Sequence, residues 1–363
     1  MSVRLEQIME TGRRQHKPIL LLYLLFCAAC ARSDDQSTLV KLSGSTMGTT
    51  YSVQYHTQSQ SPVVVESQVA DRIQVTLDRI NNLMSTYQDD SELSIFNRQP
   101  STDWFPVAGE TYHVVRMAKD IGKRSHGALD ITVGPLVNLW SFGPEARPKI
   151  IPTDKEINEA RARTGLDLLE VQDDPKAIRK LQSGVNVDLS AIAKGYAVDK
   201  VAEDLRGLGI TDYLVEIGGE LIARGNRPDG FPWQVGIMSP ALHSPDIREV
   251  IPLSGLAMAT SGDYHNYFDF DGERFSHEID PRTGKPIQHT LASVTVVADT
   301  CTEADAWATA LLVLGPTEGL EVAKSEKLAV LFLVREGSDF QDLTTLKFRN
   351  LFSDSNVPDQ SVP

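Results

Sequence analysis

Hydrophobic residues recur three or four positions apart in residues 63–84, a spacing that places them on one face of a helix. The members of this stripe are Val65, Val69, Ile73, Leu77, Ile80 and Met84. We therefore predict a long amphipathic helix that belongs to the core and not to a cofactor site. Further helices are predicted over residues 111–125, 153–163 and 301–315. The second of these begins with a capping box formed by Thr153 and Glu156.

Alternation of hydrophobic and polar residues predicts strands between these helices. The predicted strands occupy residues 42–55, 127–143, 213–225, 233–237, 250–253, 292–297 and 328–334. The segment 127–143 is interrupted by a Gly-Pro pair, and the segment 213–225 is bent at Gly218 and Gly219. Helices mixed with largely antiparallel strands predict an α+β fold.

Residues 264–279 form two alternating runs around Asp271 and Gly272, which is a strong signal for a tight hairpin turn. In this register Asn266 lies opposite His277, and His277 shares a face with the phenylalanines of the hairpin. A histidine on an apolar face is more often a core residue than a catalyst. The pairing alone leaves both readings open.

The stretch 185–201 combines a short apolar strand that ends at Asp188 with a helix that begins within about three residues. Ser190 is the candidate N-cap of this helix, and Gly209 marks its end. A helix N-terminus that follows a strand directs free N–H groups and partial positive charge at a ligand, and this suits a phosphate. Asp188 would repel a phosphate unless a divalent cation lies between them or the carboxylate bonds a sugar or base.

The predicted helix 301–315 carries polar residues near its start that form a second candidate site. Thr302 and Asp305 have the spacing of a capping pair that requires no ligand. Asp305 and Thr309 lie four residues apart, so a carboxylate and a hydroxyl on one helix face also suit a hard cation. Both interpretations are compatible with the sequence.

Charge and motifs narrow the class of ligand. The formal net charge is −14, and because residues 1–29 carry four basic and two acidic residues, the remainder stands at −16. Such a chain is poorly suited to nucleic acid, whereas a phosphorylated ligand held through Mg²⁺ is compatible with it. The chain has no GxGxxG after a strand and no Walker P-loop, which argues against Rossmann and P-loop folds.

The N-terminus has the pattern of an export signal. Basic residues precede the apolar run PILLLYLLFCAAC, which is too short to span a bilayer with certainty. Ala28 and Ala29 before Cys30 resemble a bacterial lipobox, although Cys27 stands where Leu is usual. We expect a lipoprotein signal over residues 1–29, a polar tether over 30–40 and a loose tail over 353–363; a plain secretory signal is the alternative.

Eight sequence blocks occur in an order that resembles one protein family. They are GSTMGTTYSV, MSTYQDDSELSIFN, GALDITVGPLVNLW, VDLSAIAKGYAVD, EIGGE, ATSGDY, SHEIDPRTG and EADAWATALLVLG. Together they resemble the bacterial FAD:protein FMN transferases, the ApbE flavinyltransferases. The resemblance implies a T-fold-related α+β architecture of mixed, largely antiparallel sheets packed with helices. It also implies that residues 41–352 form the catalytic module, either as one body or as two intimate subdomains.

The activity implied by this resemblance is the Mg²⁺-dependent transfer of the FMN part of FAD onto a Thr or Ser hydroxyl of a target protein, with release of AMP. The implied acceptors are subunits of membrane redox complexes of the Rnf type or the sodium-pumping NADH:quinone reductase type. A periplasmic FAD carrier and an FAD pyrophosphatase that yields FMN and AMP are the alternatives. The implied location is the periplasmic side of the cell envelope, with a lipid anchor at Cys30 and the inner membrane favoured.

The resemblance also assigns site residues by position. The implied FAD contacts are Met47, Tyr87, Ala128, Leu129, Asp130, Asp188, Lys194 and Ile279. The implied Mg²⁺ ligands are the backbone carbonyl of Ala191 and the side chains of Asp305 and Thr309. His277 is the candidate base for the acceptor hydroxyl. A cation between the acidic groups and the FAD pyrophosphate would explain how an acidic protein binds two phosphates.

Overall fold

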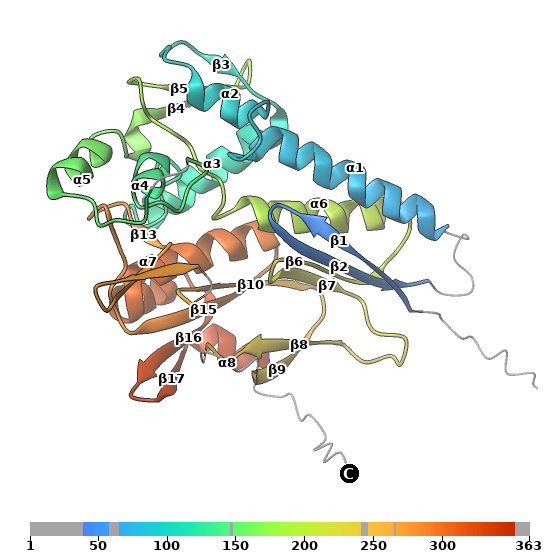
Figure 1. Cartoon of the computed structure of the whole chain (residues 1–363). Coiled ribbons are helices and arrows are strands. Elements are labelled where there is room, and N and C mark those ends of the chain that lie inside the picture. Colours follow the sequence, from blue (N-terminus) through green and yellow to red (C-terminus); the bar gives the residue numbers. More distant parts are fainter. Residues whose placement is uncertain (1–38, 58–64, 146–147, 241–245, 265, 353–363) are drawn as a thin grey trace, which may run out of the picture. The chain divides into compact units, whose positions relative to one another are not determined.

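An antiparallel sheet of eight strands organises the part of the chain that the structure describes (Figure 1). This structure is a computed structural model, and it describes residues 39–57, 65–145, 148–240, 246–264 and 266–352. The strands in spatial order are β1 (Val40–Thr46), β2 (Thr49–His56), β6 (Asp212–Ile217), β7 (Glu220–Arg224), β10 (Leu256–Gly262), β15 (Leu291–Ala298), β16 (Ala329–Glu336) and β17 (Asp339–Thr344). Every neighbouring pair in this sheet is antiparallel, which confirms the α+β prediction.

Two helices, α6 (Ala193–Gly207) and α7 (Cys301–Ser325), pack on one face of the sheet (Figure 1). Their apolar side chains join those of β2, β6, β10 and β15 in the largest core cluster. The first helical segment of α7 ends at Gly315, as predicted. Gly315 has a non-helical φ of 77°, Pro316 follows it, and a second helical segment continues to Ser325 across this kink.

Three further helices lie outside α6 and α7 together with a small sheet. These elements are α1 (Glu66–Met84), α2 (Glu92–Arg98), α3 (Gly109–Arg124), η1 (Leu166–Leu168), β3 (Phe105–Pro106), β4 (Leu169–Gln172) and β5 (Ala177–Lys180). The hydrophobic stripe predicted for α1 is buried from Val69 to Met84, as expected, whereas Val65 precedes the helix and is 49% exposed. The stripe therefore attaches α1 to α6 through its apolar face.

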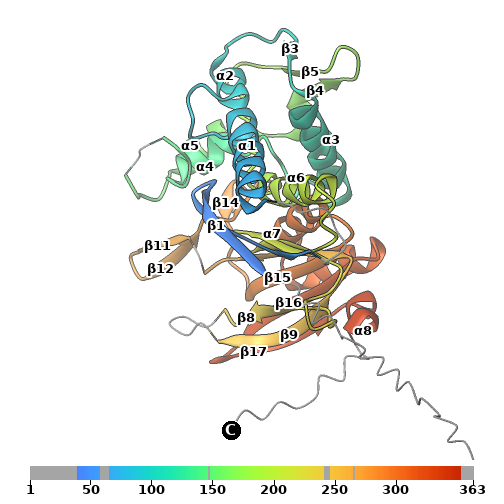
Figure 2. The same cartoon turned by 90° about the vertical axis from the view of Figure 1, so that its right-hand side faces the viewer.

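The opposite face of the large sheet is covered by the hairpin of β8 (Trp233–Met238) and β9 (Ile247–Leu253) and by α8 (Leu346–Phe352) (Figure 2). Alternate residues of β8 point inward, which fits the period-2 pattern of its sequence. Helices on one face and a hairpin on the other bury both sides of the sheet. Within the described residues, no helix is both long enough and apolar enough to cross a membrane.

A third, smaller core joins two short helices to the predicted hairpin. Its elements are α4 (Gly134–Leu139), α5 (Asp154–Arg161), β11 (Tyr267–Phe270), β12 (Glu273–Ser276), β13 (Ile279–Asp280) and β14 (Lys285–Pro286). Phe268 pairs with Phe275 as predicted, and the turn residues Asp271 and Gly272 have φ values of 49° and 83°. The capping box at the start of α5 is also confirmed.

Two predicted strands are absent from the described structure, and both lie near the candidate site. Residues 127–133 form turns that lead into α4, because Gly134 and Pro135 begin a helix. Residues 185–188 are held by a single parallel bridge between Asn186 and Val133. Residues 185–188 do alternate between buried and half-buried positions, whereas residues 128–132 are all buried. Side chains, and not a neighbouring strand, supply part of the backbone hydrogen bonding in both segments.

Candidate functional site

The joint between α6 and α7 is the most closely packed part of the candidate site. The Gly195 N–H donates to the Asp305 Oδ2 at 2.9 Å. A Cβ on Gly195 would lie 2.3 Å from the carbonyl oxygen of Cys301, so only glycine permits this approach. Asp199 accepts hydrogen bonds at 2.8 Å from the backbone N–H groups of both Cys301 and Thr302. The N-terminus of α7 is therefore fixed directly onto α6.

Of the two interpretations that the sequence left open for the start of α7, the capping pair of Thr302 and Asp305 is not formed. Thr300 is the N-cap of α7, and its side chain accepts from the Glu303 N–H at 3.3 Å. The Thr302 hydroxyl donates to Asp199 at 2.5 Å, and Asp305 is turned toward α6. Asp305 therefore does not cap α7, and its carboxylate instead contacts α6.

Three charged side chains meet beside this joint. The Lys194 Nζ lies 2.5 Å from the Glu220 Oε1, and Asp305 is only 2% exposed. Burial opposes the positive charge of Lys194, but the carboxylates of Asp305 and Glu220 outweigh it and raise the pKa of Lys194. Burial raises the pKa of Asp305 and raises that of Glu220 to about 8. The joint therefore holds one cation between two carboxyl groups, and a further positive charge would stabilise it.

The atoms that the family resemblance implies as metal ligands are oxygen atoms, which a hard cation prefers. The Gly195 N–H donates to Asp305, so the Ala191 carbonyl does not receive the helical hydrogen bond that this N–H would otherwise give. Thr309 lies one turn after Asp305, and its hydroxyl is 3.2 Å from the Ser261 Oγ. Within the described residues no group of three or more His, Cys, Asp or Glu side chains is placed to hold a metal. A carbonyl, a hydroxyl and one carboxylate are oxygen ligands of the type that Mg²⁺ accepts.

The predicted N-cap Ser190 is also wrong, and the correction explains the position of Asp188. The residue preceding α6 is Ile192, which makes no side-chain cap. Ser190 instead donates its backbone N–H and its hydroxyl to the Asp188 Oδ1, at 2.8 and 2.6 Å. Asp188 is therefore held in a local turn, with its carboxylate ahead of the helix.

Asp130 lies in a turn of the same kind beside Asp188. Its Oδ1 accepts from the backbone N–H and the hydroxyl of Thr132, at 2.8 and 2.6 Å. The Asp188 N–H donates to the Ile131 carbonyl at 2.7 Å and joins the two turns. Burial raises the pKa of Asp130 in spite of these bonds.

Two residues that the sequence analysis did not single out hold the segment before Asp188. Asn97 accepts from the Val187 N–H and donates to the Val187 carbonyl, both at 2.8 Å, in the way a neighbouring strand would. The buried Lys180 donates to the carbonyls of Asn97 and Val185, at 2.9 and 3.3 Å. Asn97 is the last residue of the block MSTYQDDSELSIFN and Lys180 lies outside the quoted blocks, and for both residues it is the fold that reveals this role.

The remaining predicted FAD contacts come from separate elements. Met47 is in the tight turn between β1 and β2, with a φ of 50°. Ala128 and Leu129 are buried after α3, and Ile279 is buried in β13. Tyr87 is 69% exposed, and its hydroxyl donates to the Phe142 carbonyl at 3.4 Å.

The Tyr87 phenol lies close to Asp188. Partial enclosure of the ring and the charge of Asp188 raise the pKa of Tyr87. The structure therefore brings Tyr87 together with Asp188, and brings Lys194 together with Asp305. Met47 and Ile279 are placed by the first hairpin and by β13, respectively.

His277 follows β12, and each of its ring nitrogens has a polar neighbour. Its Nδ1 is 3.0 Å from the Asn266 carbonyl, and its Nε2 is 3.4 Å from the Glu278 Oε1. The ring meets Phe142 edge-on with 6.3 Å between centroids, so His277 shares the face of the hairpin phenylalanines as predicted. Burial raises the pKa of Glu278. Among the sequence candidates, His277 is the imidazole that carries an adjacent buried carboxyl.

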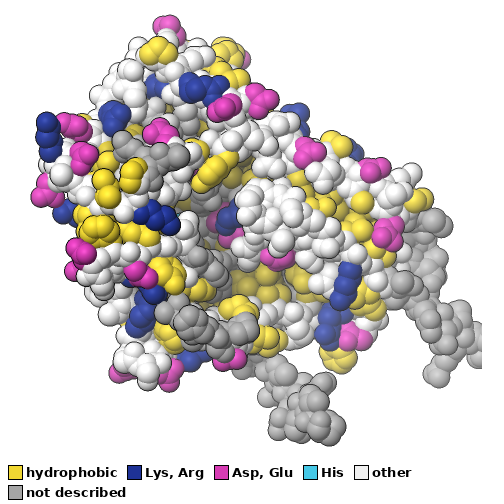
Figure 3. All heavy atoms as spheres, in the orientation of Figure 1, with side chains coloured by type: hydrophobic (Ala, Val, Ile, Leu, Met, Phe, Trp, Pro, Cys, Tyr) yellow, Lys and Arg dark blue, Asp and Glu magenta, His cyan; other side chains and the backbone are white. Residues whose placement is uncertain are grey.

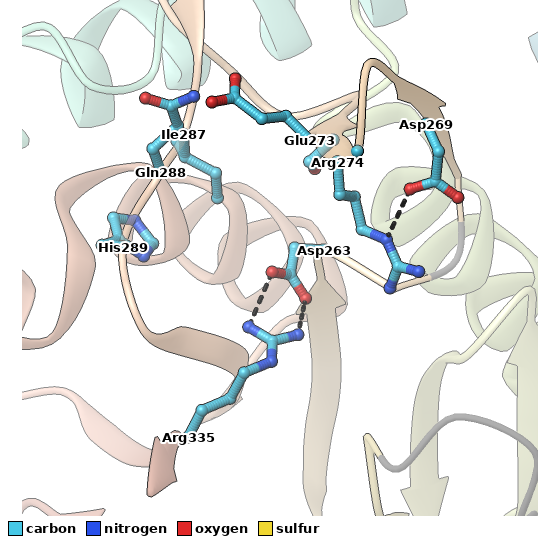
Figure 4. Close-up of a pocket in the computed structure, with 10 residues that line it drawn as sticks. Asp263, Asp269, Glu273, Arg274, Ile287, Gln288, His289 and Arg335 are labelled. Atoms are coloured by element: carbon cyan, nitrogen blue, oxygen red, sulfur yellow. Dashed lines mark hydrogen bonds and ion pairs between the residues drawn. The ribbon is translucent and has the colours of Figure 1, made fainter. Parts of the chain in front are cut away.

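A cavity of about 540 Å³ opens beside the same hairpin (Figure 4). In it Arg335 makes two hydrogen bonds to Asp263, at 2.8 and 2.5 Å, and Arg274 pairs with Asp269 at 3.3 Å. On the face shown in Figure 3, acidic and basic side chains are interspersed and form no large area of one sign. Both arginines of the cavity are therefore paired with carboxylates, whereas the buried Nδ1 of His289 has no partner among the described residues.

Comparisons with known proteins identify related sequences. The sequence model of the ApbE family matches residues 47–332. The FAD:protein FMN transferase of Vibrio cholerae is 44% identical over 336 residues, which cover 92% of this chain and 98% of that protein. The FAD:protein FMN transferase of Haemophilus influenzae is 42% identical over 337 residues, which cover 92% and 96%.

Solved structures show the same fold. The flavin transferase ApbE from Vibrio cholerae superposes with a TM-score of 0.81 at 42% identity, covering 87% of this chain and 100% of that chain. The apo form of the Pseudomonas stutzeri flavinyl transferase ApbE gives a TM-score of 0.80 at 38% identity, covering 87% and 97%. Sequence and structure agree over most of the described residues, and the chain belongs to the ApbE family.

Proposed function

We propose that this chain transfers the FMN part of FAD onto a Thr or Ser hydroxyl of an acceptor protein and releases AMP. It is an enzyme of the ApbE family, and its relatives at 42 to 44% identity carry the name FAD:protein FMN transferase. The observation that best supports the proposal is the joint of α6 and α7. There a buried carboxylate, Asp305, and a lysine, Lys194, lie beside a helix start that follows Asp188.

Mg²⁺ is the cofactor we propose, held by the Ala191 carbonyl, Asp305 and Thr309. When bound, it would neutralise charge on the FAD pyrophosphate. The chain itself supplies the positioning. The Gly195 N–H orients the Asp305 carboxylate, and Ser261 orients the Thr309 hydroxyl. Lys194 adds positive charge on the same side, and its raised pKa keeps it protonated.

The FAD contacts proposed from the family are compatible with their positions. Tyr87 is exposed and offers a ring on which a flat group can stack. Ala128 and Leu129 precede the Asp130 turn, which is linked to the Asp188 turn. Met47 and Ile279 complete the proposed contacts from the first hairpin and from β13.

His277 is the proposed general base. If its Nδ1 carries the hydrogen and donates it to the Asn266 carbonyl, its Nε2 is free to accept a proton. The acceptor hydroxyl oxygen then forms the new bond to the FMN phosphorus while the bond to the bridging oxygen breaks and AMP leaves. The proton passes to the Nε2, and Glu278 at 3.4 Å stabilises the imidazolium.

The test is to incubate the protein with FAD, Mg²⁺ and an acceptor domain that carries a Thr. We expect flavin fluorescence on the acceptor that survives a denaturing gel, together with release of AMP. Tight FAD binding without labelling of an authentic acceptor would instead indicate an FAD carrier. FMN and AMP formed at full rate without any acceptor would indicate an FAD pyrophosphatase.

The proposed acceptors are subunits of membrane redox complexes of the Rnf type or the sodium-pumping NADH:quinone reductase type, so we also propose export and lipid anchoring at Cys30, on the periplasmic side of the inner membrane. The support is the basic and apolar pattern of residues 1–29, which lie outside the described residues.

We predict that cells incorporate a labelled fatty acid into the wild-type chain and that Cys30→Ser abolishes the labelling. Cys27→Ser is the matched control and should keep the label. Label retained in Cys30→Ser would disprove this anchor.

A further inference from the structure

A second cavity, of about 450 Å³, lies between α3, α6 and the strands β6 and β7. Its lining includes Tyr196 and Lys200 of α6, residues on faces of that helix that do not carry the charged joint. Cavities of this size hold small organic ligands. The proposed transfer reaction makes no use of it.

The floor of this cavity contains buried polar groups without partners. Tyr213 is 0% exposed, and its hydroxyl makes no hydrogen bond within the described residues. Arg224 lies directly opposite Tyr213 in the pairing of β6 with β7, and its Nη1 is likewise buried and unpaired. A buried donor or acceptor that is left without a partner destabilises the fold. An unpaired buried polar group is more easily tolerated where a ligand or a water molecule provides its hydrogen-bond partner.

The cavity is lined by three basic side chains, Lys200, Arg206 and Arg224, and by three acidic ones, Asp199, Glu203 and Asp299. Arg206 and Arg224 both act on the Tyr213 phenol and oppose the burial that raises its pKa, whereas Asp199 adds to the rise. Neither arginine forms an ion pair among the described side chains; the Arg224 Nη2 donates to the Asp299 carbonyl, at 3.0 Å. The Asp199 carboxylate is already engaged by the N-terminus of α7. Two guanidinium groups and a hydroxyl are a suitable set of donors for a phosphate or a carboxylate.

The walls of the cavity favour a flat or apolar body. His113 and Tyr196 lie with ring centroids 6.1 Å apart, and Met117 and Ile222 also line the cavity. Aromatic rings, a thioether and an aliphatic side chain provide surface for stacking and apolar contact. A ligand that fits both the floor and the walls has an anionic head and an aromatic body.

We propose that this cavity is a second ligand site, separate from the transfer site, that binds a small aromatic molecule with a phosphate or carboxylate head. The head would bond the Tyr213 hydroxyl and the Arg224 Nη1, and the body would lie against Tyr196 and His113. The site does not depend on the proposed transferase activity, because none of these side chains belongs to the transfer site.

The test uses calorimetry on the full enzyme with its transfer site filled by FAD, in the absence of Mg²⁺ and acceptor. The probes are AMP for a phosphate head, benzoate for a carboxylate head and adenosine as the uncharged counterpart. We expect AMP or benzoate to bind and adenosine to bind at least about tenfold more weakly, which is the effect of losing a charge-assisted hydrogen bond. The stronger of the two anions assigns the head group.

Three variants connect binding to the cavity floor. Tyr213→Phe and Arg224→Met should each raise the Kd of the anion about tenfold. Tyr213→Phe should not lower the melting temperature, since the hydroxyl it removes has no partner in the protein. Tyr55→Phe is the matched control, because the Tyr55 hydroxyl is also buried and unpaired and faces Tyr213 across β2 and β6, but Tyr55 does not line the cavity. It should leave the Kd unchanged.

The proposal is overturned if neither anion binds at millimolar concentration, or if adenosine binds as well as AMP. It is also overturned if Tyr213→Phe and Arg224→Met leave the Kd unchanged. Flavin transfer to an acceptor is measured separately, so failure of this site and failure of the transferase activity are distinguishable.

Discussion

Asp305 illustrates how one side chain serves both the fold and the proposed chemistry. Its Oδ2 accepts the Gly195 N–H and so ties α7 to the start of α6. The negative charge is buried beside Lys194 and Glu220, where a bound cation would stabilise it. The two roles can be separated, because an amide oxygen replaces the hydrogen-bond acceptor but not the charge.

We predict that Asp305→Asn and Asp305→Ala both reduce Mg²⁺-dependent transfer by about a hundredfold or more, because a hard ligand with full charge is lost. Asp305→Asn should remain more stable than Asp305→Ala by about 1 kcal/mol, since it can still accept the Gly195 N–H. Transfer rates over a range of Mg²⁺ concentrations and denaturant melts measure the two effects. Unchanged turnover at limiting Mg²⁺ would remove Asp305 from the metal site.

His277 is distinguished from the other histidines by its neighbours. We predict that His277→Ala lowers the transfer rate by about 10² to 10⁴ while FAD affinity is largely retained, because a general base contributes in that range. Single-turnover transfer and a separate FAD titration provide the measurements. His126→Asn is the control, since His126 lies on the surface with a positive φ that Asn tolerates. If His277→Ala loses its fold as well as its activity, His277 is a core residue and not the base.

At the scale of elements, the sequence pattern correctly predicted the helices and strands whose backbone hydrogen bonds are made within the helix or by a neighbouring strand. The stripe of α1, the capping box of α5 and the turn of β11 and β12 follow from local spacing, and all three are confirmed. The segment 127–133 instead forms local turns, and the segment 185–188 has the alternation of a strand but is held by the side chains of Asn97 and Lys180. Local pattern cannot reveal the second case, because Asn97 lies 90 residues from Val187 in sequence.

The support given by Asn97 is itself testable. We predict that Asn97→Ala lowers the free energy of unfolding by about 1–3 kcal/mol, because the Val187 N–H and carbonyl lose their partners. FAD binding should weaken as well, since Asp188 follows this segment directly. Denaturant unfolding and FAD titration measure both effects. Gln74→Ala, which removes an exposed hydrogen bond on α1, should change stability by less than about 0.5 kcal/mol; an equally small effect of Asn97→Ala would show that the segment needs no such support.

At the scale of the whole molecule, the candidate site is an assembly of elements far apart in the chain. Lys194 comes from α6, Glu220 from β7 and Asp305 from α7. The family resemblance identified Lys194 and Asp305 as site residues, but it included Glu220 only as the last residue of the block EIGGE. Its role depends on burial, and burial depends on how the sheet and the helices pack. Sequence alone therefore indicates the chemistry of the site more readily than its electrostatics.

Burial of Glu220 makes stability depend on pH with a defined sign. Its pKa is raised to about 8 in the folded enzyme, whereas an unfolded glutamate titrates near 4.3, so between these values only the folded state holds the proton. This contribution is fully present below the unfolded pKa and is lost as pH rises through the folded value. The free energy of unfolding should therefore fall between about pH 4 and pH 8. Glu220→Gln cannot titrate, so its stability should fall less over that range, with denaturant melts at several pH values as the measurement. Glu203→Gln, on the exposed face of α6, should keep the wild-type slope, and an equal slope in Glu220→Gln would mean that Glu220 is already ionised when the protein folds.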